Sequence, residues 1–240
     1  MNESIARLST GMRSMYGGDA AGQSIANTLE ARSKSWAMAA RNAEDGISAS
    51  QTVESALLEI AALAQRLREL GIQADNNALH QSASDTAALN AEATALFDAI
   101  DAIRDGATFN GVTLLDADGV SNNIGVTDAG GTVALVTGKT HTAVASYTLA
   151  LNADVTADTT LQEVAISLGH VAAGIAALKG RQAVAYSASA NLAAAAARVE
   201  DTDFAKETAN LTKNSVLNQS AMAMVAQANQ AQSAILAVLN

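Results

Sequence analysis

The segment with the clearest resemblance to a chemical site lies near the amino terminus. Residues 17–24 read Gly-Gly-Asp-Ala-Ala-Gly-Gln-Ser and nearly match the phosphate-binding pattern G-x-x-x-x-G-K-[ST]. That chemistry needs a lysine on the phosphates and a strand that feeds the loop. Gln23 occupies the lysine position, and no strand pattern precedes the loop. We therefore interpret the segment as a tight turn between two helical stretches.

The remaining polar residues do not have the spacing of a catalytic or metal site. Cysteine is absent, and the histidines, His80, His141 and His170, lack the i, i+4 spacing of metal ligands. Carboxylate and amide side chains between residues 116 and 123 lack the EF-hand spacing. No set of residues joins a nucleophile, a base and an orienting group. The sequence predicts no enzyme, no cofactor and no metal.

One charged segment could instead contact a partner. Gln65-Arg66-Leu67-Arg68-Glu69 lies in a stretch that we predict to be helical. Arg66 and Glu69 are spaced i, i+3, which brings opposite charges together on a helix surface. The simplest interpretation is a solvated helix face.

The composition favours long helices and argues against binding to nucleic acid. Proline, which interrupts helix interiors, is absent, and aromatic residues make up only 3% of the chain. Since large aromatics normally supply much of a core, small residues packed between long helices are expected here. The formal net charge is −10, and Lys and Arg are not clustered. Nucleic-acid binding and attraction to anionic membranes are therefore not expected.

The sequence predicts neither membrane insertion nor a cleaved signal peptide. No run of 18 or more apolar residues occurs, and the amino terminus lacks a basic segment followed by an apolar one. By these rules the chain stays in the cytoplasm unless it leaves by a route that needs no cleaved signal.

Four apolar seams with alternating spacings of three and four residues predict packed helices. Two lie in residues 1–107: Val53, Leu57, Ile60, Ala64, Leu67, Gly71 and Ala74, then Leu89, Ala93, Leu96, Ile100 and Ile103. Two lie in residues 158–240: Val164, Leu168, Val171, Ile175, Leu178, Gln182 and Ala185, then Leu217, Ala221, Met224, Ala228, Ala231, Ile235 and Val238. Every apolar stripe needs a partner, and the last seam is mostly small residues. We expect helices from both chain ends to pack together and the last seam to pack in an assembly.

The middle of the chain, residues 108–157, predicts a small β insertion. Asn110-Gly111 between short apolar stretches is a strong signal for a type I′ hairpin. Residues 132–137 and 143–151 alternate like strands, whereas residues 116–131 read as loop. The predicted fold is mainly α: a long antiparallel helical bundle or coiled coil formed from both chain ends, with a middle that contains a β-hairpin.

Six short motifs, in order, resemble those of bacterial flagellins. They are Ser4 to Gly11, the D-A-A-G of Asp19 to Gly22, Ala40 to Ser48, Phe109-Asn110-Gly111, Arg198 to Ala205, and the A-Q-A-N-Q of Ala226 to Gln230. The motifs span roughly residues 5–115 and 164–239. Each is short, and six in the family's order make chance improbable.

The resemblance implies a structural subunit of the bacterial flagellar filament, self-assembling for cell motility. It implies other flagellin subunits, the flagellar export apparatus and its chaperone as partners. It also implies an extracellular location, reached without a cleaved signal peptide. In flagellins that the vertebrate innate immune receptor recognises, the Q-R-x-R-E segment contributes to binding with a glutamate that aligns with Glu92. In the filament the same surface is largely a subunit interface.

The chain departs from the family pattern in three respects. Flagellins have a helical segment upstream of the position of Ser4, which this chain lacks, so we expect it to polymerise poorly. The central region is short, and Gln232-Ser233 stands where the family usually has a proline.

Two alternatives to a filament subunit remain at this point. A cell-surface adhesin or polysaccharide-binding receptor would use exposed aromatics, for which the sequence offers Trp36, Tyr16, Tyr147 and Tyr186. The hook–filament junction protein shares the end segments, but the A-Q-A-N-Q and F-N-G motifs favour flagellin.

Overall fold

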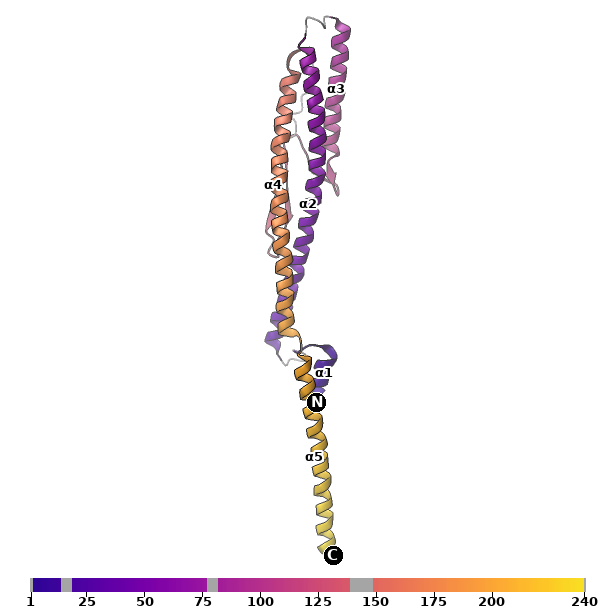
Figure 1. Ribbon diagram of the computed structural model, residues 1–240, viewed down its shortest axis with the longest axis vertical. Helices are drawn as coiled ribbons and strands as arrows, with labels where there is room; N and C mark the ends of the chain where they lie inside the picture. Colours follow the sequence, from indigo (N-terminus) through magenta and orange to yellow (C-terminus); the bar gives the residue numbers. More distant parts are fainter. Residues whose placement is uncertain (1, 14–18, 77–81, 139–148, 240) are drawn as a thin grey trace. The chain divides into compact units, whose positions relative to one another are not determined.

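The computed structural model describes residues 2–13, 19–76, 82–138 and 149–239 (Figure 1). Its helices are α1 (Asn2–Thr10), α2 (Ala20–Ala74), α3 (Ala83–Gly106), α4 (Leu149–Glu200) and α5 (Phe204–Leu239). Its strands are β1 (Thr108–Phe109), β2 (Val112–Thr113), β3 (Val120–Gly125) and β4 (Thr132–Thr137). The prediction of a mainly α chain with a small β insertion is confirmed.

The chain forms two compact units. One unit combines both chain ends, Met1–Ser33 with Ala190–Asn240, and the other comprises Lys34–Ser189. We call them the terminal unit and the bundle unit.

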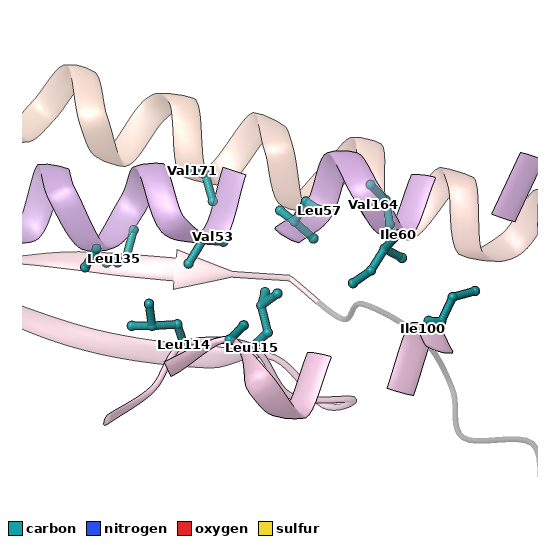
Figure 2. Packing of buried hydrophobic residues seen from close by; sticks show 11 residues of the cluster. Val53, Leu57, Ile60, Ile100, Leu114, Leu115, Leu135, Val164 and Val171 are labelled. Atoms are coloured by element: carbon teal, nitrogen blue, oxygen red, sulfur yellow. The ribbon is translucent and has the colours of Figure 1, made fainter. Parts of the chain in front are cut away.

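The α2, α3 and α4 seams, three of the four that were predicted, form the core of the bundle unit. Val53, Leu57 and Ile60 of α2 are fully buried and belong to one cluster with Val164 and Val171 of α4. Ile100 of α3 and three leucines of the β region belong to the same cluster, as Figure 2 shows: Leu114, Leu115 and Leu135. Each apolar stripe therefore finds the partner that amphipathic helices need.

The order of contacts along the helices makes the bundle antiparallel. Ala43, near the middle of α2, packs with Leu178, whereas Leu67, late in α2, packs with Ala157, which is nearer the start of α4. Leu67 also packs with Phe97 of α3. Helices α3 and α4 therefore both run in the direction opposite to α2, and the three helices lie side by side in Figure 1.

The D-A-A-G motif starts a helix rather than a phosphate site. The Asp19 carboxylate accepts a hydrogen bond from the Gly22 backbone N–H at 2.8 Å, as an N-cap residue does three positions before its partner. A Cβ on Gly22 would lie 2.3 Å from Asp19 Oδ2, which is too close. Glycine at position 22 therefore leaves room for the Asp19 carboxylate to cap the helix. Residues 17 and 18 lie outside the described residues.

The first predicted hairpin is confirmed. β1 and β2 pair antiparallel with Phe109 opposite Val112, and Asn110 and Gly111 have φ values of 50° and 77°. Positive φ at both central positions is the requirement of a type I′ turn.

The second hairpin corrects the prediction. β4 has the predicted bounds, but its partner is β3, with Val120 opposite Thr137 and Gly125 opposite Thr132. Asparagine and glycine are depleted in strands, which is why the sequence predicted a loop at residues 120–125. In the structure, β4 supplies the hydrogen bonds that make these residues a strand. The predicted strand at 143–151 is wrong at residues 149–151, which are helical, and its residues 143–148 lie outside the described residues.

Helix α4 begins earlier than the sequence indicated, since residues 149–157 lie in it rather than in a β insertion. Its first turns contain β-branched and short polar residues, which weaken the local helical signal. Ala157 is fully buried against Leu67 and Leu70, and this packing favours the helix.

Candidate assembly surfaces

The described part of the last predicted seam is uncovered in the folded chain. Its described members on α5 are all exposed: Leu217, Ala221, Met224, Ala228 and Ala231. Leu217 is 56% exposed and Met224 is 72% exposed. The side chains of Ile235 and Val238 lie outside the described residues. Since helices owe most of their stability in proteins to packing, a helix this bare needs a partner.

Helix α5 is held only near its start, among the described residues. Helix α1 contacts it, and Arg7 lies 3.7 Å from Glu207, whose side chain is 10% exposed. The Thr202 backbone N–H, just before α5, donates to the Gly11 carbonyl at 2.8 Å. From Thr212 to Gln232, every residue except Ser215 is exposed.

Arg13 joins the end of α4 to the start of α2 within the terminal unit. Its guanidinium donates to the Val199 carbonyl at 2.9 Å and to the Asp19 carboxylate at 3.0 Å, and its backbone N–H donates to Glu200. A cation at a helix C-terminus and an anion at an N-terminus both match the helix dipoles. Sequence reasoning did not single out Arg13, because its partner carbonyl is 186 residues away.

The charged segment on α2 forms an ion-pair network that reaches two other helices of the bundle unit. Arg66 Nη2 lies 2.8 Å from Glu92 on α3, and Arg66 Nη1 lies 2.9 Å from Glu69, as the i, i+3 spacing predicted. Arg68 lies 2.6 Å from Asp158 on α4. The hydrogen bond to Glu92, followed by that to Glu69, raises the pKa of Arg66.

The charged patch therefore comprises Gln65, Arg66, Arg68, Glu69 and Glu92, which are all exposed. Leu67 is 0% exposed and belongs to the core, as its place in the α2 seam predicts. Asp158 also belongs to these ion pairs, although the sequence did not indicate it, because it lies 90 residues from its partner Arg68.

Tyr186 on α4 contacts α2, and the pH dependence of the protein's stability can test this contact. Its hydroxyl donates to the Glu44 carboxylate on α2 at 2.5 Å, and this hydrogen bond, with desolvation, raises the pKa of Tyr186 above 10.0. Because the pKa of Tyr186 is higher in the folded chain, the hydrogen bond stabilises the fold at pH values below the pKa of Tyr186 in the unfolded chain. This stabilisation is lost as the pH rises through the pKa of Tyr186 in the folded chain. We expect Tyr186→Phe to abolish that part of the alkaline loss of stability.

The measurement compares urea midpoints of wild type and Tyr186→Phe at about pH 8 and about pH 11. Wild type should lose more stability between the two values than the variant does. Tyr16 and Tyr147 are present in both proteins and cancel in the comparison. Equal losses in the two proteins would contradict the role of the Glu44 bond.

One described helical segment, Asp154–Glu200, is long and apolar enough to cross a membrane by length and composition alone. A single such helix is weak evidence, because core helices pass the same test. In the bundle unit its Val164, Val171 and Leu178 face other elements of the core. These three side chains are thus occupied by helix packing, although only 28% of the apolar window is buried. Among the described residues, no three His, Cys, Asp or Glu side chains gather as a metal site.

Comparisons with known proteins identify the chain's relatives. The family model of the bacterial flagellin N-terminal helical region matches residues 1–119, and that of the C-terminal helical region matches residues 156–239. A flagellin of Halalkalibacterium halodurans is 36% identical over 250 residues, which cover 99% of this chain and 91% of that protein.

A flagellin of Bacillus subtilis is 32% identical over 279 residues, covering 99% of this chain and 92% of that protein. The crystal structure of Bacillus cereus flagellin aligns with a TM-score of 0.42 and 26% identity, covering 63% of this chain and 88% of that one. Two family models that together match most of the chain, and full-length relatives above 30% identity, lead to one conclusion: the chain belongs to the bacterial flagellin family.

Proposed function

We infer that this chain is a structural subunit of the extracellular bacterial flagellar filament. The observation that carries the inference is the uncovered α5 seam, which presents Leu217, Ala221 and Met224 to solvent in the isolated chain. Small residues allow close approach of a second helix, and the flanking apolar side chains supply buried area. A seam satisfied by neighbouring subunits through contacts between unlike surfaces builds an open polymer rather than a closed ring.

We propose that the subunit reaches the filament through the flagellar export apparatus, with a chaperone and without a cleaved signal peptide. The absence of cysteine is compatible with passage in an unfolded state, since no disulfide can form prematurely.

The adhesin alternative finds no support in the observations above. Of the aromatics that could stack on a sugar, Trp36 packs against Ala39, Ala40 and Ala185. The Tyr186 hydroxyl donates a hydrogen bond to the Glu44 carboxylate. Tyr16 and Tyr147 lie outside the described residues.

The test uses the bacterium that encodes the chain. Deleting the gene should remove or shorten filaments in electron micrographs, and the wild-type gene should restore them. Ala221→Asp places a charge in the seam and should fail to restore filaments, because an unpaired buried charge is strongly unfavourable. The matched control is Ala226→Asp, about 180° around α5 from the seam centre at 100° per residue. Unchanged filaments after gene deletion, or full rescue by Ala221→Asp, would contradict the proposal.

The same cells test the charged patch as a subunit contact. The triple variant Arg66→Glu, Glu69→Arg and Glu92→Arg keeps both intramolecular pairs of residue 66 but reverses the three surface charges. If the patch only stabilises the bundle, this swap should fold and form normal filaments. We propose contact with a neighbouring subunit and therefore expect a stable protein that assembles poorly. The innate immune receptor is the other candidate partner of this patch, and a receptor reporter assay on the same variant tests it.

A further inference from the structure

Met224 is a large, flexible side chain in the α5 seam. Its neighbours on the same helix face, Ala221 and Ala228, are small and cannot cover it, and it is 72% exposed. The thioether sulfur of an exposed methionine is oxidised to the sulfoxide by hydrogen peroxide. The residue that the proposed assembly must bury is thus open to solvent before assembly.

We propose that Met224 is an oxidative modification site whose sulfoxide prevents the subunit from joining a filament. This inference rests on the proposed filament function and adds a regulation of the same surface. In the reaction the peroxide O–O bond breaks and one oxygen forms a bond to sulfur. The other oxygen leaves as water, so the sulfur loses two electrons and the peroxide gains them.

Oxidation changes the property on which the seam depends. The sulfoxide is polar and chiral, whereas the thioether is apolar and adaptable. Burying a polar group without a hydrogen-bond partner is unfavourable, and the alanines on either side provide no side-chain donor. The described fold should be unaffected, because Met224 contributes nothing to its buried core.

Met222 supplies a matched control two residues away. It is 70% exposed, so peroxide should reach it as readily as Met224. At 100° per residue it points about 160° away from Met224 and lies off the seam. Oxidation at the two positions therefore has similar chemistry but different expected consequences.

The experiment starts from filaments sheared from the bacterium that encodes the chain. They are depolymerised to monomers, treated with hydrogen peroxide and added to untreated filament seeds. Oxidised wild type and oxidised Met222→Leu should show a critical concentration raised about tenfold or more. Met224→Leu, a volume-conserving change, should assemble normally before and after peroxide. Mass spectrometry confirms sulfoxide at each remaining methionine, and circular dichroism confirms that the fold persists.

The outcomes separate this inference from the filament function. If untreated wild-type monomers do not grow from seeds, the proposed function itself fails. Normal growth of oxidised wild type would overturn the inference and leave the function intact. Loss of growth in oxidised Met224→Leu would also overturn it, because another oxidised residue would then be responsible.

Discussion

Replacing Leu57 with alanine is expected to lower the free energy of unfolding by about 3 to 5 kcal/mol. Leu57 is 0% exposed and lies in the cluster where α2, α3, α4 and the β region meet. Removing its branched end deletes buried apolar area and leaves a cavity that neighbouring helices cannot close without moving. Figure 2 shows the side chain between α2 and α4 beside Val164.

The adjacent residue gives the control for this prediction. Leu58 is 56% exposed, so Leu58→Ala should cost less than about 1 kcal/mol in the isolated chain. Denaturant unfolding followed by circular dichroism measures both changes with one signal. Similar midpoints for the two variants would mean that the α2 seam does not face the core.

Replacing Gly119 with alanine should have the second largest effect, a loss of about 2 to 4 kcal/mol. Gly119 has φ of 85°, which favours glycine, and it precedes β3 directly. A Cβ there would lie 2.7 Å from the Thr137 carbonyl oxygen, a backbone atom of the paired strand. The turn conformation and the strand pairing would both resist the new methyl group.

Gly130 separates these two contributions. Its φ is 81°, but a Cβ there would meet nothing within 4 Å. Gly130→Ala should therefore show only the conformational cost, about 1 to 2 kcal/mol. Hydrogen exchange at the β3 and β4 amides, together with the thermal midpoint, reports both variants. Equal effects at the two glycines would contradict the backbone clash at Gly119.

Residue patterns alone were enough to predict the helical core and one hairpin. The 3.5-residue period of the α2, α3 and α4 seams marks the face that each helix buries, since apolar spacing and helix geometry are both local. Asn110-Gly111 specified the first turn for the same reason, because few residues tolerate positive φ at both positions. Six short motifs in the family's order carried the resemblance to flagellins.

The pairings between distant residues were decided by the tertiary structure. Residues 120–125 form strand β3 because β4 supplies their hydrogen bonds, although the residue types themselves favour a loop. Arg68 pairs with Asp158, which is 90 residues away in the sequence, and Arg13 donates to the Val199 carbonyl, which is 186 residues away. Local periodicity can state which face of a helix needs a partner but not which residue supplies it. The sequence by itself therefore determined that the α5 seam is apolar, and only the fold decided that the chain leaves it uncovered.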